Sequence, residues 1–192
     1  MYMTRIGLDL SINSTGICIN KDNKYTYYII SSKLTKKQRE FTHKRVHIIE
    51  YNKEVIDKND SYEIKEYKKT INIYNVCKCI QDIIKKHKDA HCYIEGISYG
   101  SVGSAALVDL SGLNFMVRYM LTSLGIPFTI ISPTSNKKFA TGNGNADKDM
   151  MIDAWRRLDK NIKDIKDIKI DDLADAFFLS QTTLENRFSI II

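Results

Sequence analysis

The chain has few cysteines, and their spacing does not suit a metal. The sequence has no C-x-x-C pair, and none of its four cysteines has a histidine partner at zinc-finger spacing. The cysteines are Cys18, Cys77, Cys79 and Cys92. This pattern argues against a structural zinc site. We therefore expect reduced thiols, as in a protein of the cell interior.

Long apolar runs are also missing. The N-terminal stretch MYMTRIGLDL lacks the apolar core of a signal peptide, and nowhere does the sequence reach the roughly 18 apolar residues that a membrane-spanning helix needs. We therefore expect a soluble cytoplasmic protein with no membrane partner. Because 192 residues can bury most of the surface that the unfolded chain exposes, we expect a single domain over residues 1–192.

Basic residues outnumber acidic ones. The chain has 29 Lys and Arg against 23 Asp and Glu, a net charge of +6, which favours a polyanionic partner. The excess is concentrated in the segment 33–45, where Glu40 is the single acid. This segment predicts a basic loop, which either contacts the polyanion or is an ordinary solvated loop. Its basic residues are Lys33, Lys36, Lys37, Arg39, Lys44 and Arg45.

The hydrophobic pattern predicts an α/β domain. Three strands at hairpin spacing open the chain, and later strands alternate with amphipathic helices, as parallel strands require. We expect a mixed five-stranded sheet, three antiparallel strands followed by two parallel ones, flanked by helices; residues 44–51 are ambiguous between strand and helix. The strands are expected at 3–10, 14–20, 25–31, 91–95 and 126–132, and the main helices at 62–87, 104–124, 146–158 and 171–187.

Carboxylates stand at the ends of two predicted strands. Asp9 closes the strand in IGLDLSINSTG and Glu95 closes YIE, while Asp172 and Asp175 share one face of the last helix. Burying such acids is costly without a charge partner, and acids in one place raise each other's pKa. A hard divalent cation resolves both problems, because it prefers oxygen ligands. These four acids therefore predict a site for Mg2+, or for Mn2+ in its place.

Structural roles for the same acids remain open. Asp9 could start the tight turn after the first strand, and Glu95 could simply end its strand. Asp171 or Asp172 could be the N-cap of the last helix, a role that we assign to Asp171. Asp175 is hardest to explain structurally, since the helix continues past it as AFFLS.

Four segments in order carry a family resemblance: IGLDLSINSTG, YIEG, SPTSNKKFATGNGNADK (132–148) and DDLADA. With these motifs the chain resembles the RuvC-type Holliday junction resolvases of the ribonuclease H-like superfamily, over nearly its whole length. The resemblance implies a ribonuclease H-like fold and a structure-selective DNA endonuclease that acts on four-way or other branched DNA. Its catalytic acids would be Asp9, Glu95, Asp172 and Asp175, and two basic residues near the scissile phosphate would be Lys137 and Lys148.

The expected chemistry is phosphodiester hydrolysis with two Mg2+ ions, one activating water and one stabilising the leaving 3'-oxygen. We expect Asp9 to bridge the ions, and Glu95 and Asp172 each to favour one of them. Asp175 would complete the coordination or position water, and Lys148 would offset charge on the phosphate. The products would carry 5'-phosphate and 3'-hydroxyl ends.

The glycine-rich loop ATGNGNADK fits an anion but not a nucleotide cofactor. Gly142 and Gly144 allow the backbone to approach a phosphate, and a helix start at Ala146 would offer free N–H groups. The loop lacks the G-x-x-x-x-G-K-[ST] pattern of ATP-binding loops, so we predict no nucleotide cofactor. An ordinary flexible loop with a solvated Lys148 is the structural alternative.

Further DNA contacts and the partner follow from the resemblance. The predicted DNA-binding residues are Lys137, Lys138, Tyr99, Lys36, Lys37 and Arg39. Ser98 stands where the family commonly has an aromatic wedge, and Tyr99 follows it, so the resemblance does not predict distortion of the junction by a wedge. The basic insertion after the third strand suggests a phage or viral member. Paired nicks imply a two-fold homodimer, with the helix around 107–124 at its interface or simply packed in the core.

Three other functions remain as alternatives. A phosphotransferase of the actin-like kinase superfamily also begins with an acid and a Ser/Thr/Gly-rich turn, but it needs a second domain that 192 residues cannot supply. A non-catalytic protein that binds branched DNA would have no use for four clustered acids beside phosphates. A ribonuclease or general nuclease on the same scaffold would differ only in substrate.

Overall fold

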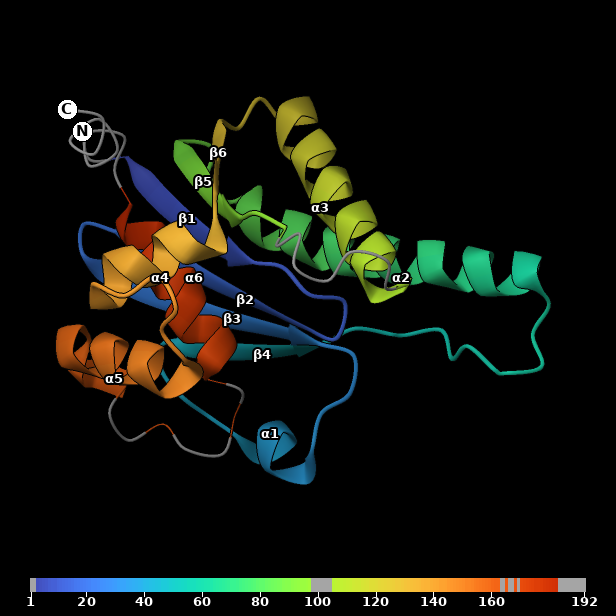
Figure 1. Ribbon diagram of the computed structural model, residues 1–192, viewed down its shortest axis with the longest axis horizontal. Coiled ribbons are helices and arrows are strands. Elements are labelled where there is room, and N and C mark those ends of the chain that lie inside the picture. Colours follow the sequence, from blue (N-terminus) through green and yellow to red (C-terminus); the bar gives the residue numbers. More distant parts are fainter. Residues whose placement is uncertain (1–2, 98–104, 163–164, 166–167, 169, 183–192) are drawn as a thin grey trace.

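The computed structural model describes residues 3–97, 105–162, 165, 168 and 170–182, and its centre is a single six-stranded sheet (Figure 1). The strand order is β4-β3-β2-β1-β5-β6. The strands are β1 (Thr4–Asp9), β2 (Ser14–Lys21), β3 (Lys24–Ser31), β4 (Val46–Glu50), β5 (Ala90–Glu95) and β6 (Phe128–Ile131).

The pairing of the strands confirms the mixed sheet and corrects its size. The first three strands form an antiparallel meander, and β5 and β6 add to β1 in parallel. The expected five strands are six, because β4 pairs in parallel with β3 at the edge. This is the segment with the ambiguous pattern: Val46 is buried, whereas His47 is exposed and Ile48 and Ile49 are half-buried. Five residues are too few for a period of two to stand out from a helical period.

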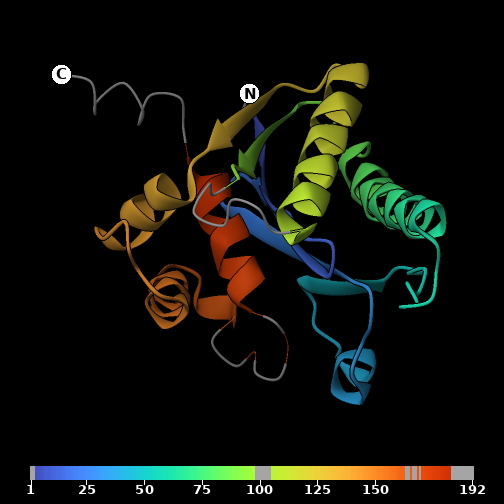
Figure 2. The same ribbon diagram turned by 45° about the vertical axis from the view of Figure 1, so that its right-hand side comes forward.

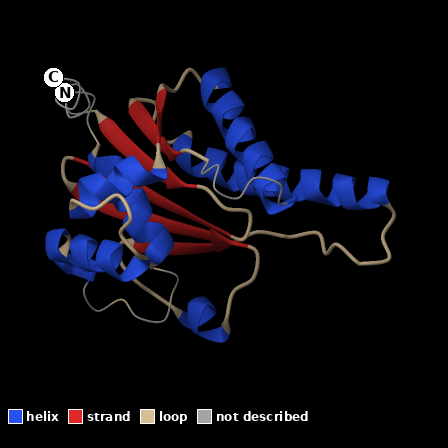
Figure 3. Ribbon diagram, viewed as in Figure 1, coloured by secondary structure: helices blue, strands red, loops and turns tan. Residues whose placement is uncertain are grey.

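Helices cover both faces of the sheet (Figures 2 and 3). One layer consists of α2 and α3, which pack on β1 and β5 through Ile80 and Val117. The other layer contains α5 and α6, whose Trp155 and Phe177 pack on β2 and β3. The helices are α1 (Lys36–Glu40), α2 (Tyr62–Ile84), α3 (Ala105–Ser123), α4 (Pro133–Thr141), α5 (Lys148–Leu158) and α6 (Asp171–Gln181). Within the described residues, no helix is long and apolar enough to cross a membrane.

Glycines let α6 lie directly on the sheet. A Cβ atom at Gly7 would lie 1.9 Å from the carbonyl oxygen of Ala176, and one at Gly16 would lie 2.2 Å from that of Asp172. Both distances are impossible for real atoms, so β1 and β2 need glycine at these points of contact. The consequence is that α6 lies against the central strands along most of its length, from Asp172 to Ser180.

Three local expectations need correction. The basic segment is not all loop, because Thr35 and Gln38 form a capping box that starts α1. The helix expected from Ala146 starts at Lys148, with the Asp147 carboxylate accepting from the backbone N–H of Met150 at 2.9 Å. That carboxylate occupies the helix start that was expected to receive an anion. Asp171 is not an N-cap either, since Ile170 holds that position without a side-chain cap.

Candidate active site

Asp9 and Glu95 end two neighbouring parallel strands. The register of β1 and β5 pairs Leu8 with Ile94, so the next residue of each strand is an acid at the same edge. Side chains alternate along a strand, and Gly7 faces α6, so Asp9 faces α6 as well. Both carboxylates are half-buried at the carboxyl edge of the sheet, where sites of α/β folds form.

The close contact of α6 with β2 brings two further acids to this edge. Gly16, which touches the backbone of Asp172, is the register partner of Asp9. The hydroxyl of Ser14 donates a hydrogen bond to Oδ2 of Asp172. Asp175 lies one turn further along α6, on the same face. Residues separated by more than 150 positions in the chain thus meet beside Asp9.

The acids influence one another electrostatically. Burial raises the pKa of Asp9 well above its usual value, and Glu95, Asp175, Asp172 and Asp171 raise it further. Burial and the charge of Asp175 raise the pKa of Glu95 to about 7. Burial also raises the pKa of Asp175 to about 6, against the opposing charge of Lys137. Every resolved influence on the pKa of Asp9 is unfavourable to its charged form.

The predicted basic residues lie at different distances from these acids. Lys137 on α4 is close enough to lower the pKa of Glu95 and Asp175. Lys148, at the start of α5, forms an ion pair with Asp171 at 2.5 Å, which raises the pKa of its own ammonium group. Lys138 is exposed on α4. The site thus has one lysine beside the acids and one at its border.

The other predicted DNA contacts lie on α1 or outside the described residues. Lys36, Lys37 and Arg39 are exposed on α1. Arg39 pairs with Glu50 at 2.9 Å, and Lys36 lies 3.9 Å from Glu40. Tyr99 lies outside the described residues, so its place relative to the acids is untested.

The acidic side chains suit a hard divalent cation, although they are not arranged as a closed site. Among the described residues, no three His, Cys, Asp or Glu side chains stand close enough to hold one metal ion as they are. The mutual pKa shifts nevertheless show that the four acids share one electrostatic environment. Oδ1 of Asp175 is buried and has no hydrogen-bond partner in the described part of the chain. Oxygen ligands with unbalanced negative charge are what Mg2+ or Mn2+ prefers, so the residues present fit such an ion.

Comparison with known proteins finds likeness in structure only. No protein-family model and no curated protein matches the sequence. Thermus thermophilus RuvC aligns over 93% of this chain and 91% of its own, at 13% identity and a TM-score of 0.57. The same enzyme in complex with a Holliday junction substrate gives 0.61, again at 13% identity. The chain has a RuvC-type fold.

A chain of the Cas12f1–sgRNA–target DNA complex shares this RuvC-type fold as well. It aligns over 92% of the present chain but only 38% of its own, at 15% identity and a TM-score of 0.52. The ribonuclease H-like fold expected from the sequence is therefore confirmed. At such identities the likeness establishes the fold alone, and a fold hosts many functions. None of these matches bears on a phage or viral origin, which stays a prediction.

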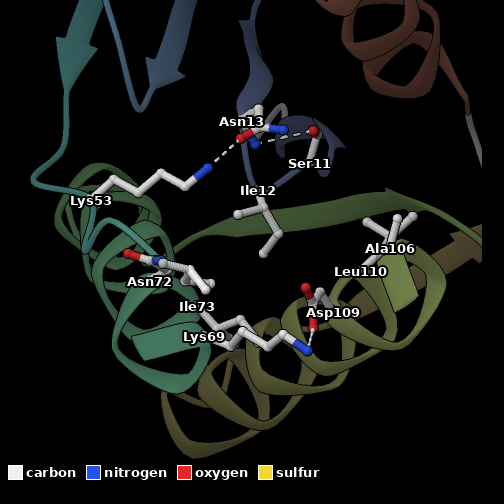
Figure 4. A pocket seen from close by; sticks show the side chains of 11 residues that line it. Ser11, Ile12, Asn13, Lys53, Lys69, Asn72, Ile73, Ala106, Asp109 and Leu110 are labelled. Carbon is white, nitrogen blue, oxygen red and sulfur yellow. Dashed lines mark hydrogen bonds and ion pairs between the residues drawn. The ribbon is translucent and has the colours of Figure 1, made fainter. Parts of the chain in front are cut away.

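A separate pocket lies on the other side of this RuvC-type sheet (Figure 4). Its volume is about 290 Å³, and it lies between the β1–β2 turn, α2 and α3. Its lysines have polar partners: Lys53 donates to Oδ1 of the uncharged Asn13 at 2.7 Å, and Lys69 lies 3.7 Å from the carboxylate of Asp109. None of the four acids lines it. The lining residues are Ser11, Ile12, Asn13, Lys53, Ile56, Lys69, Asn72, Ile73, Ala106, Asp109 and Leu110.

Several contributors to the acidic site were not recognised from the sequence. Ser14 and Asn136 are buried uncharged residues that contact the acids or their backbone. Gly16 allows the approach of α6, and Asp171 pairs with Lys148. Their nearness to predicted site residues in sequence was the only available signal, since Ser14 follows Asp9 by five positions and Asn136 precedes Lys137.

Proposed function

We propose that the protein is a metal-dependent endonuclease that hydrolyses phosphodiester bonds of Holliday junctions and other branched DNA. The observation that carries this proposal is that four acids come together at one sheet edge, where neighbouring carboxylates raise one another's pKa. The acids are Asp9, Glu95, Asp172 and Asp175. The net charge of +6 supports a polyanionic substrate. The shared fold with a RuvC that binds a Holliday junction supports DNA as that polyanion.

The cofactor that we propose is Mg2+, two ions per active site, with Mn2+ able to replace it. Asp9, Glu95, Asp172 and Asp175 would hold the ions through their carboxylate oxygens. When bound, divalent ions lower the pKa of an attacking water and stabilise the leaving 3'-oxygen. No nucleotide cofactor is needed for this hydrolysis, which leaves 5'-phosphate and 3'-hydroxyl ends.

The chain's own basic residues would receive the phosphate. Lys137 already acts on Glu95 and Asp175, so it lies where a scissile phosphate beside these acids would carry its charge. Lys148 is largely exposed and tied to the site by the single ion pair with Asp171. Exchanging that carboxylate for a phosphate oxygen would bring Lys148 onto the substrate, where its charge offsets the negative charge that develops on the phosphate.

Affinity for the rest of the DNA would come from basic residues away from the acids. Lys36, Lys37 and Arg39 on α1 and Lys138 on α4 are exposed cations suited to phosphate contacts. We keep Tyr99 as a contact to the junction. Such contacts release counterions, so we expect binding to weaken steeply as the salt concentration rises.

We further propose a two-fold homodimer, because paired symmetric nicks require two active sites on one junction. The outward face of α3 supports this interface. Val108, Phe115 and Tyr119 are strongly exposed on one stripe, and the Arg118 guanidinium lies 4.7 Å from the centre of the Phe115 ring. Val117 and Leu121, which the sequence placed on the interface helix, are fully buried against the sheet. The exposed stripe is therefore the part of α3 available to a second copy.

The decisive experiment is cleavage of a labelled four-way junction in Mg2+. The unmodified protein should nick opposite strands symmetrically, whereas Asp9→Asn should bind the junction and leave it intact. Asp153→Asn is the matched control, because Asp153 is an exposed aspartate on α5.

A substrate panel separates the remaining alternatives. Duplex, flap, three-way and RNA–DNA hybrid substrates should be cut more slowly than the four-way junction. Preferred cleavage of the hybrid would indicate a ribonuclease on the same scaffold. Binding of junctions with no metal-dependent nicking by the unmodified protein would indicate a non-catalytic binder and would refute the proposal.

A further inference from the structure

Two buried uncharged side chains touch the acidic site. Ser14 on β2 is 3% exposed, and its hydroxyl donates to Oδ2 of Asp172. Asn136 on α4 is 1% exposed, and its amide nitrogen donates to the backbone carbonyl of Asp175 at 3.3 Å. Ser14 reaches α6 from strand β2 of the sheet, and Asn136 reaches it from α4.

Asn136 ties α4 to α6 at the acidic site. Its amide nitrogen donates to the Asp175 carbonyl, and its side chain also lowers the pKa of Glu95. An amide nitrogen has two hydrogens, so it can serve both partners. The amide oxygen Oδ1 of Asn136 is also buried, and it has no hydrogen-bond partner among the described residues.

The uncharged character of both donors matters. A lysine or arginine at these positions would hold the carboxylates but would also cancel the negative charge that attracts a divalent cation. A hydroxyl or amide fixes the orientation of a carboxylate or of the backbone that bears it and leaves the charge in place. Groups that orient metal ligands in this way commonly change metal affinity by 10–100-fold when removed.

We propose that Ser14 and Asn136 are positioning residues that orient Asp172 and the backbone of Asp175 for the binding of divalent cations. This inference rests on the proposed function, because it concerns the same acidic site. Neither residue is a ligand in it. Ser14 orients one acid of α6, and Asn136 fixes the backbone of another by tying α6 to α4.

The chain offers a matched control for each residue. Ser31 is the register partner of Ser14 on the neighbouring strand, is 4% exposed, and donates to the backbone oxygens of Asn13 and Lys33 rather than to an acid. Asn72 on α2 is 2% exposed and, like Asn136, donates from its amide nitrogen to a backbone carbonyl. Its partner is Glu54, at 3.0 Å, which is not one of the four acids.

The test measures Mn2+ binding to the DNA-free protein by electron paramagnetic resonance, together with the Mg2+ concentration that gives half-maximal junction cleavage. We expect Ser14→Ala and Asn136→Leu to weaken Mn2+ binding by roughly tenfold and to raise the Mg2+ requirement in parallel. Ser31→Ala and Asn72→Leu should stay within about twofold of the unmodified protein. Ser14→Thr, which restores a hydroxyl, should recover most of the affinity.

Thermal unfolding of the same variants separates positioning from folding. A loss of Mn2+ affinity in Ser14→Ala at an unchanged Tm supports the inference even where Asn136→Leu is too unstable to purify. Unchanged Mn2+ affinity in Ser14→Ala, or equal losses in the Ser31→Ala control, would overturn it. If instead the unmodified protein neither binds Mn2+ nor cuts the junction, the proposed function itself fails.

Discussion

Two regions of the molecule hold their acids in opposite ways. At the start of α2, Lys68 contacts the half-buried Asp60 at 2.7 Å, and this contact lowers the pKa of Asp60. On the face covered by α6, Asp9 is surrounded by other acids, and its pKa is raised. The difference indicates that the second arrangement is not selected for stability, because unpaired buried charge destabilises a fold.

The largest expected effect is on catalysis, and it should be confined to the α6 face. Asp175→Asn should reduce junction cleavage on the order of 10³-fold with unchanged junction affinity, because it removes a carboxylate from the reacting centre. Asp60→Asn should leave cleavage within about twofold and slightly lower the Tm, since it removes only a structural ion pair. Single-turnover cleavage and gel-shift assays measure both. Equal losses of activity would remove the distinction between the two regions.

The next effect concerns backbone contact on the two faces. Gly16→Ala should destabilise the protein by about 1–3 kcal/mol and also reduce cleavage, because the new methyl group would push the Asp172 backbone away from the sheet. Gly112→Ala on α3 meets only the end of the Ile73 side chain, at 3.0 Å, which can move aside. That variant should retain its activity. Urea unfolding and junction cleavage together provide the measurement.

A pH effect should distinguish the two regions in the protein without metal. The folded-state pKa of Glu95 is about 7 and that of Asp175 about 6, against ordinary values of 4.5 and 3.8. Between about pH 4 and pH 7 the folded state therefore binds more protons than the unfolded state. Stability should be fully present below this window and fall by about 1–3 kcal/mol as the pH rises through it.

The Glu95→Gln variant should show a weaker dependence of stability on pH, because a glutamine side chain does not titrate. The contribution of Asp60 to stability should change with pH in the opposite direction. Because the pKa of Asp60 is lowered in the folded state, this contribution is present at neutral pH and is lost on acidification. Urea unfolding in EDTA at pH 3, pH 5 and pH 7.5, for the unmodified protein, Glu95→Gln and Asp60→Asn, checks these signs, because the Asp60 contribution is lost only below its ordinary pKa of 3.8. A Glu95→Gln variant that keeps the full pH dependence would contradict the coupling of the acids.

The smallest effect is on DNA affinity outside the acidic site. Lys36→Ala on α1 should weaken junction binding a few-fold and reduce the salt slope by about one, as loss of a single phosphate contact does. Lys85→Ala, which removes an exposed lysine at the end of α2, should leave both quantities unchanged. Binding measured at several salt concentrations tests the pair. Identical salt slopes for both variants would exclude α1 from the DNA contact.

Local patterns in the sequence were enough to place many elements of this fold. The near-continuous apolar run in β1, the period of α2 and the glycine after α3 identified these elements, because neighbouring residues determine them. The edge strand β4 was not identified, since five residues carry little periodic signal. The start of α5 was placed two residues early because the Asp147 cap, rather than the preceding apolar Ala146, determines where the helix begins.

By itself, the sequence determined which acids end strands and that Asp175 lies beyond any capping position. It could not determine what lies beside them, because that depends on contacts between residues far apart in the chain. Only the tertiary structure placed α6 against Gly7 and Gly16, tied Asp172 to Ser14, and tied Asn136 to the backbone of Asp175. The physical reason is that secondary structure follows from local periodicity, whereas an electrostatic site forms only when packing brings separate elements together.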